Sequence, residues 1–110
     1  IQADLKKKGW PWEIAKSFDQ SACIGEFIPL YKAKNIDFTI RKNGVEVQHG
    51  NTEMLIFTFD KIISYVSQFF TLQQGDLIYT GTPKGVGPVA VGDILEGFVD
   101  EQKLLHCEVK

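Results

Sequence analysis

The dipeptide Asn43-Gly44 constrains the fold of this chain more than any other feature. It separates two runs, residues 38–41 and 45–48, in which apolar and polar side chains alternate. A two-residue type I′ turn requires positive φ at both central positions, and Asn-Gly adopts that conformation at little steric cost. We therefore predict an antiparallel hairpin over these two runs.

A second strong pattern lies in residues 58–72. Thr58 is a suitable N-cap, and Asp60 places a negative charge in the first turn. The spacing of the apolar side chains predicts one helix with a single apolar stripe, which we expect to pack on the sheet as core. The stripe consists of Phe59, Ile62, Ile63, Val66, Phe69 and Phe70.

The remaining elements are shorter. Residues 1–8 have the pattern of a helix end, with Gly9 at the position after the last turn. Apolar runs predict strands over residues 77–79, 94–99 and 104–109. Because strands outnumber helices and no βαβ alternation occurs, the sequence predicts a β-rich α+β fold with one packed amphipathic helix, built as a mixed, bent sheet or roll.

Length and charge exclude several classes of protein. A chain of 110 residues supports one small domain. Its net charge of −2 and its scattered lysines argue against nucleic acid as a partner. No apolar run approaches the roughly 20 residues that span a bilayer. Cys23 and Cys107 lack a CxxC partner and are far apart in sequence, so we expect two free thiols in a cytoplasmic protein, with neither a zinc site nor a disulfide framework.

Residues 80–88 (TGTPKGVGP) form the first candidate site. Three glycines and two prolines in nine residues exclude regular structure and predict a stiff loop. Such a loop can offer backbone N–H groups and the hydroxyls of Thr80 and Thr82 to an anionic oxygen. It can equally be a tight connection between two strands, and the residues alone leave both interpretations open.

Lys16 is the second candidate. It stands between Ala15 and Phe18 in a segment rich in aromatic side chains. A lysine in apolar surroundings either extends its ammonium group to solvent or acts as a positioned cation. Composition alone favours the first of these roles.

These stretches together resemble the fumarylacetoacetate hydrolase family. Gln2 with residues 6–12 and 15–19 resembles the central segment of the family, and residues 80–88 resemble its C-terminal signature. Residues 50–54 and 63–65 are also similar. The resemblance covers essentially the whole chain, and implies that residues 1–110 are the C-terminal part of one catalytic domain with a mixed β-roll fold, in a homodimer.

The resemblance also implies a chemistry. It points to a Mg²⁺- or Mn²⁺-dependent enzyme of small keto acids, which hydrolyses acylpyruvates, decarboxylates or tautomerises oxaloacetate, or isomerises a hydroxyheptadienedioate. A cation that binds the α-keto acid oxygens would stabilise enolate charge. The resemblance makes Lys16 the catalytic cation. It makes Gln2, the Gly81 N–H and the Thr82 hydroxyl the substrate-binding groups.

One part of the family pattern is missing. The family holds its metal with a Glu-x-Glu pair and an aspartate, and no Glu-x-Glu occurs in this sequence. We expect these ligands, and the general base, in residues that precede Ile1. A non-catalytic binding domain that keeps the fold and lacks the metal site therefore remains the alternative to an enzyme.

Overall fold

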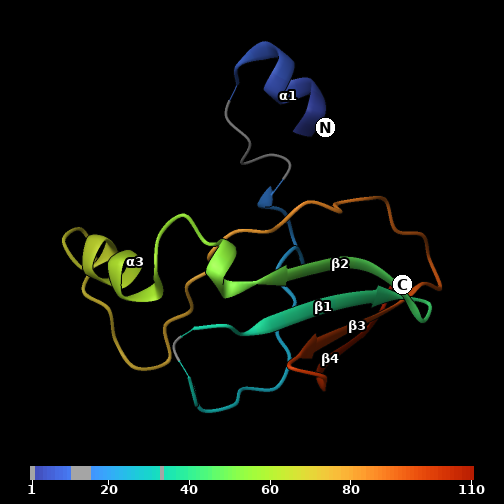
Figure 1. Ribbon diagram of the computed structural model, residues 1–110. Helices are drawn as coiled ribbons and strands as arrows, with labels where there is room; N and C mark the ends of the chain where they lie inside the picture. The colour runs from blue at the N-terminus through green and yellow to red at the C-terminus, as the bar shows by residue number, and fades with distance from the viewer. Residues whose placement is uncertain (1, 11–15, 33) are drawn as a thin grey trace.

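The computed structural model describes residues 2–10, 16–32 and 34–110. Four strands form an antiparallel sheet in the order β2-β1-β3-β4 (Figure 1). This arrangement confirms a β-rich α+β fold. The elements are α1 (Gln2–Lys8), β1 (Asp37–Lys42), β2 (Val45–Asn51), the 3₁₀ turn η1 (Thr52–Met54), α3 (Phe59–Val66), β3 (Ile94–Val99) and β4 (Gln102–Glu108).

The predicted hairpin is confirmed as β1 and β2. Asn43 and Gly44 occupy the turn with φ values of 52° and 82°, as a type I′ turn requires. The turn is also tied to the start of β3. The Asn43 N–H donates to the Ile94 carbonyl at 2.8 Å, and the Asn43 Oδ1 accepts from the Ile94 N–H at 2.9 Å. The hairpin tip is therefore held by side-chain as well as backbone bonds.

The two C-terminal strands also form, joined by a turn in which Asp100 and Glu101 have positive φ. The pairing of β3 with β4 changes register, so that Leu104 has no opposite residue. Such a bulge frees backbone groups from the ladder. The Leu104 carbonyl accepts instead from the Glu26 N–H at 2.7 Å. The bulge thus fixes the segment around Glu26 beside β4.

Helix α3 begins where the sequence predicts and ends earlier. The Thr58 Oγ1 accepts from the Lys61 N–H at 3.3 Å and caps the helix. The helix stops at Val66, six residues before the predicted end at Leu72. The Ser67 hydroxyl donates to the Ser64 carbonyl at 2.9 Å. Side-chain bonds of this kind compete with the backbone hydrogen bonds of a helix. After the helix, Gln68 and Phe69 donate to carbonyls only three residues earlier, which makes tighter turns.

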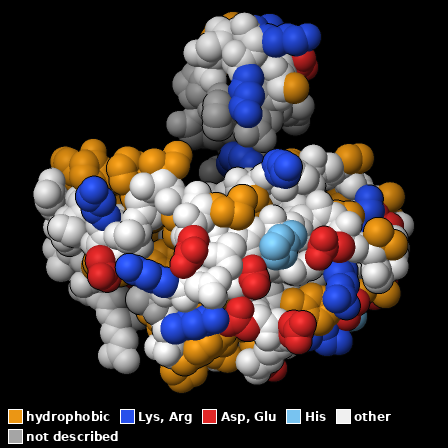
Figure 2. All heavy atoms as spheres, viewed as in Figure 1, with side chains coloured by type: hydrophobic (Ala, Val, Ile, Leu, Met, Phe, Trp, Pro, Cys, Tyr) orange, Lys and Arg blue, Asp and Glu red, His pale blue; other side chains and the backbone are white. Residues whose placement is uncertain are grey.

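The packing predicted for α3 is only partly correct. Phe59, Ile62 and Val66 are half-buried, whereas Ile63 is 47% exposed, and Phe69 and Phe70 beyond the helix end are 65% and 68% exposed. Figure 2 shows hydrophobic side chains gathered on the surface over the α3 region. A cavity of about 720 Å³ lies between the half-buried Phe59 and Ile62 of α3 and the sheet. Only one edge of the stripe therefore contacts the rest of the molecule.

Helix α1 ends in a Schellman motif, as Gly9 predicts. The Gly9 N–H donates to the Lys6 carbonyl at 3.2 Å and the Trp10 N–H to the Leu5 carbonyl at 2.9 Å. Gly9 has φ 66°. In Figure 1, α1 lies apart from the sheet. No helix within the described ranges is long and apolar enough to cross a membrane.

The predicted strand over residues 77–79 is wrong. These residues are extended without strand pairing, and Leu77 and Tyr79 are 46% and 65% exposed. An apolar run becomes a strand only where a neighbouring strand offers free backbone groups, and among the described residues this run has no such neighbour. The chain instead crosses the molecule as a loop that leads into residues 80–88 (Figure 1).

Candidate active site

The loop of residues 80–88 rests on β2. The Gln48 side chain of β2 donates through Nε2 to the Thr82 Oγ1 at 3.1 Å and to the Pro83 carbonyl at 3.2 Å. Gly85 has φ 110°, and a Cβ there would lie 2.5 Å from the Val47 carbonyl oxygen. Only glycine permits both this conformation and this approach. The loop is therefore shaped by its contact with the strand.

The far end of the loop is also anchored. The Lys42 Nζ donates to the Pro88 carbonyl at 3.3 Å. The Asp93 carboxylate accepts from the Ala90 N–H and from the Asn43 Nδ2, both at 2.9 Å. These two bonds, the Ala90 bond first, lower the pKa of Asp93. Ionised Asp93 thus holds the end of the loop on the hairpin tip.

The structure brings three of the four predicted site residues to one cavity. Lys16, Gly81 and Thr82 line a cavity of about 1140 Å³ between the loop and the segment that begins at Lys16. Gly81 has φ 99°, and no atom lies within 4 Å of where a Cβ would stand. The backbone at Gly81 therefore borders open space that a ligand can enter. Gln2 lies in α1, and its side chain is outside what the structure describes.

The charge of this cavity suits an anion. Lys6, Lys16 and Lys84 line it, and within the described part of the chain no acidic residue does. Positive side chains around a concave site raise the local concentration of an anionic ligand. The cavity can thus attract a carboxylate, with Lys16 and the hydroxyl of Thr82 as possible hydrogen-bond donors.

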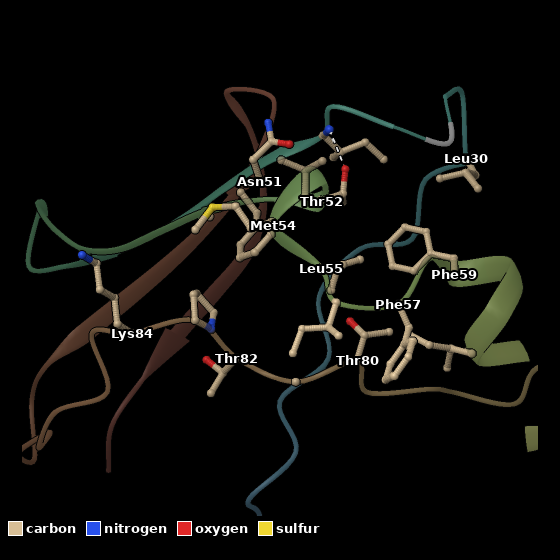
Figure 3. Close-up of a pocket in the computed structure, with 18 residues that line it drawn as sticks. Leu30, Asn51, Thr52, Met54, Leu55, Phe57, Phe59, Thr80, Thr82 and Lys84 are labelled. Carbon is tan, nitrogen blue, oxygen red and sulfur yellow. Dashed lines mark hydrogen bonds between the residues drawn. The ribbon is translucent and has the colours of Figure 1, made fainter. Parts of the chain in front are cut away.

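The loop also forms one wall of the apolar cavity beneath α3. Residues 81–84 line both cavities. Figure 3 shows the side of the loop that faces this apolar cavity, with Thr80 and Thr82 on the loop and Phe57 and Phe59 toward α3. The lining beyond the loop is mostly apolar and includes Met54 and Leu55. The loop therefore separates a positively charged space from an apolar one.

The described residues do not assemble a metal centre. Among residues 2–10, 16–32 and 34–110, no three His, Cys, Asp or Glu side chains are placed to hold an ion together. A hard divalent cation requires several oxygen ligands, and the Asp93 carboxylate is already bonded to Ala90 and Asn43. The chain thus presents groups for a substrate and no ligand set for Mg²⁺ or Mn²⁺ in its described part.

Sequence reasoning missed several residues of the site. Gln48 shows no signal beyond its place in an alternating strand, and nothing local connects it with Thr82. Ser17 and Ser21 line the Lys16 cavity, and their proximity to Lys16 in sequence was the available clue. Tyr79 also lines this cavity, but it lies in the run of residues 77–79 whose composition predicts a buried strand.

Comparison with known proteins identifies the class. The model of the fumarylacetoacetate (FAA) hydrolase C-terminal family matches residues 1–109. The chain therefore belongs to the fumarylacetoacetate hydrolase family, as the loop and the Lys16 segment predict.

Two of the similar proteins are named oxaloacetate tautomerases. The chain is 42% identical over 113 residues to mitochondrial oxaloacetate tautomerase FAHD1 of Mus musculus, covering 100% of this chain and 51% of that protein. It is 41% identical over 108 residues to oxaloacetate tautomerase YcgM of Escherichia coli K12, covering 94% of this chain and 49% of that protein. The chain thus spans about half the length of the curated relatives it matches.

Solved structures agree with the fold. The crystal structure of fumarylpyruvate hydrolase from Pseudomonas aeruginosa, in complex with Mn²⁺ and pyruvate, superposes with a TM-score of 0.82 at 36% identity. The match covers 99% of this chain and 48% of that chain. This likeness shows the fumarylacetoacetate hydrolase fold.

Proposed function

We propose that the protein is an enzyme of small α-keto acids, and that it interconverts the keto and enol forms of oxaloacetate. The observation that carries the proposal is the cavity that Lys16, Gly81 and Thr82 line together, in which no described lining residue is acidic. The names of the FAHD1 and YcgM relatives support oxaloacetate as the substrate.

Hydrogen bonding gives Thr82 a defined role in this proposal. Its Oγ1 accepts from the Gln48 Nε2 at 3.1 Å. A hydroxyl has one proton to donate and lone pairs that accept. Because one lone pair is occupied by Gln48, the Thr82 proton remains for an oxygen of the substrate in the adjoining cavity.

The proposed reaction moves one proton from C3 of the keto acid to the oxygen on C2. Negative charge grows on that oxygen when the C–H bond breaks. A positioned ammonium group and a hydroxyl stabilise such charge more strongly than they stabilise the neutral ketone. Lys16 and Thr82 would therefore lower the barrier in either direction, while Lys84 attracts a carboxylate.

We also propose a divalent cation, Mg²⁺ or Mn²⁺, as cofactor. The support is the Mn²⁺ in the Pseudomonas aeruginosa structure. Since the described residues lack a ligand set, the proposal places the ligands outside them.

Hydrolysis of an acylpyruvate is the second candidate. The apolar cavity of about 720 Å³ on the other side of the loop favours it, because an acyl tail needs apolar surroundings that oxaloacetate does not. The name of the fumarylpyruvate hydrolase neighbour also supports this reaction.

The test uses the full-length protein with Mg²⁺, with enol-oxaloacetate and acetylpyruvate as substrates and an EDTA control. The ultraviolet absorbance of each substrate and the release of pyruvate are followed together. EDTA-sensitive loss of the oxaloacetate enol without pyruvate supports the tautomerase. Pyruvate from oxaloacetate indicates a decarboxylase, and pyruvate from acetylpyruvate a hydrolase. No change in either substrate would favour the non-catalytic binding domain.

A further inference from the structure

Two thiols that are far apart in sequence lie next to each other in the structure. The Cys23 and Cys107 Sγ atoms lie 4.0 Å apart, and both cysteines are free. Cys107 is a residue of β4, and Cys23 belongs to the segment that leads from Lys16 to β1. The sequence gives no sign of this contact, because the two residues are separated by 84 positions.

The backbone around the pair is fixed on both sides. Cys107 pairs with Leu95 of β3 in the sheet. Gly25, two residues after Cys23, packs on the Leu104 carbonyl so closely that a Cβ would collide with it. The Glu26 N–H donates to that same carbonyl. The two thiols are therefore neighbours because the bulge in β4 holds the Cys23 segment in place.

We propose that Cys23 and Cys107 are a redox modification site, at which a hydroperoxide forms a reversible disulfide that ties the Lys16 segment to β4. Ala22, the neighbour of Cys23, lines the cavity that also contains Lys16. A bond at Cys23 thus acts one residue from the wall of the candidate active site.

The chemistry balances with hydrogen peroxide as oxidant. Cys23 is exposed, so its thiolate can attack the peroxide. An S–O bond forms, the O–O bond breaks and water leaves, which gives a sulfenic acid. The Cys107 thiolate then attacks the Cys23 sulfur, the S–O bond breaks and a second water leaves. Two thiols lose two electrons, and one peroxide becomes two waters.

The surroundings of Cys23 also affect how readily its thiol ionises and reacts. Partial burial is the largest cause, and the weak hydrogen bond with the Cys107 thiol is the next. Both raise the pKa of Cys23 above its ordinary value of 9.0. A raised pKa keeps a thiol protonated and slow to react at neutral pH. The reduced Cys23 thiol therefore reacts slowly with an oxidant at neutral pH.

The test treats the full-length protein, at low concentration, with hydrogen peroxide and then maps non-reduced peptides by mass spectrometry. We expect one peptide pair joined through Cys23 and Cys107, lighter than the two free peptides by two hydrogen atoms, and restored by dithiothreitol. Cys23→Ser and Cys107→Ser are matched controls that each leave one thiol of this pair and must lose the linked peptides. Only sulfinic or sulfonic products, or links between two molecules, would overturn the proposal.

Hydrogen exchange tests the tether separately. We expect amide exchange in residues 16–26 to slow several-fold after oxidation and to recover after reduction. Both serine variants should show no change under the same treatment. A linked peptide whose formation leaves exchange in this segment unaltered would contradict the claim that the bond restrains the Lys16 segment.

Discussion

The Gln48 Nε2 on β2 donates to the Thr82 Oγ1 at 3.1 Å, and thereby connects the sheet to a residue that borders both cavities. The same nitrogen also donates to the Pro83 carbonyl. One amide thus positions the hydroxyl and the backbone of the loop together. Gln48 is a positioning residue in this account, since it does not line either cavity.

Replacing Gln48 by alanine tests this relationship. Loss of the hydrogen bond to Thr82 removes about 0.5–1.5 kcal/mol, so that bond alone should lower kcat/KM by about twofold to twelvefold. The loss should appear mainly in kcat, because a misplaced Thr82 hydroxyl no longer stabilises the charge that develops in the transition state. Gln68→Ala, on an exposed side chain after α3, is the matched control. Equal kinetics in the two variants would remove Gln48 from the site.

Two glycines of the loop test whether its backbone conformation depends on the contact with β2. Gly85→Ala forces a Cβ against the Val47 carbonyl at φ 110°, and should lower the free energy of unfolding by about 1–3 kcal/mol. Gly87→Ala meets no atom within 4 Å and has no positive φ, so it should change stability little. Urea denaturation of both variants measures the difference. Equal midpoints would show that the loop does not rest on β2 through Gly85.

Acid should weaken the turn between β3 and β4 through Asp100. The Tyr31 hydroxyl, then the Asp37 N–H and Lys32, lower the pKa of Asp100 from 3.8 to about 2. The Asp37 and Lys32 bonds measure 2.9 and 3.0 Å. A lowered folded-state pKa stabilises the protein above the unfolded-state value and loses that effect as pH falls toward about 2.

Asp100→Asn isolates this effect, because asparagine tolerates the positive φ of 44° at this position. We expect the variant to be less stable than wild type above pH 4, with the difference disappearing as the pH approaches about 2. Chemical denaturation across this range measures it. A constant difference at every pH would show that Asp100 contributes by something other than its charge.

The sequence predicts this fold best where one local interaction decides the structure. Asn43-Gly44 determines the hairpin turn, Gly9 the end of α1 and Thr58 the start of α3. It fails where distant groups decide. Residues 77–79 have the composition of a strand, but pairing requires a partner edge that the residues themselves cannot reveal.

The candidate site is likewise predictable from the sequence only in part. The composition of residues 80–88 predicts a shaped loop, and the family resemblance singles out Lys16 beside it. No local pattern predicts that Gln48 holds Thr82 or that Cys23 contacts Cys107, because both relationships arise from how the sheet brings separate segments together. Tertiary contacts of this kind require the structure.

The central claim is that Lys16 acts on the substrate as a positioned cation. The most direct measurement compares the steady-state kinetics of Lys16→Ala with those of Lys34→Ala, an exposed lysine outside both cavities, in the full-length protein with oxaloacetate. Circular dichroism first establishes that both variants fold. The account predicts that kcat falls by about a hundredfold or more in Lys16→Ala, as when a transition-state donor is removed, and stays near wild type in Lys34→Ala. Equal kcat values in the two variants would contradict it.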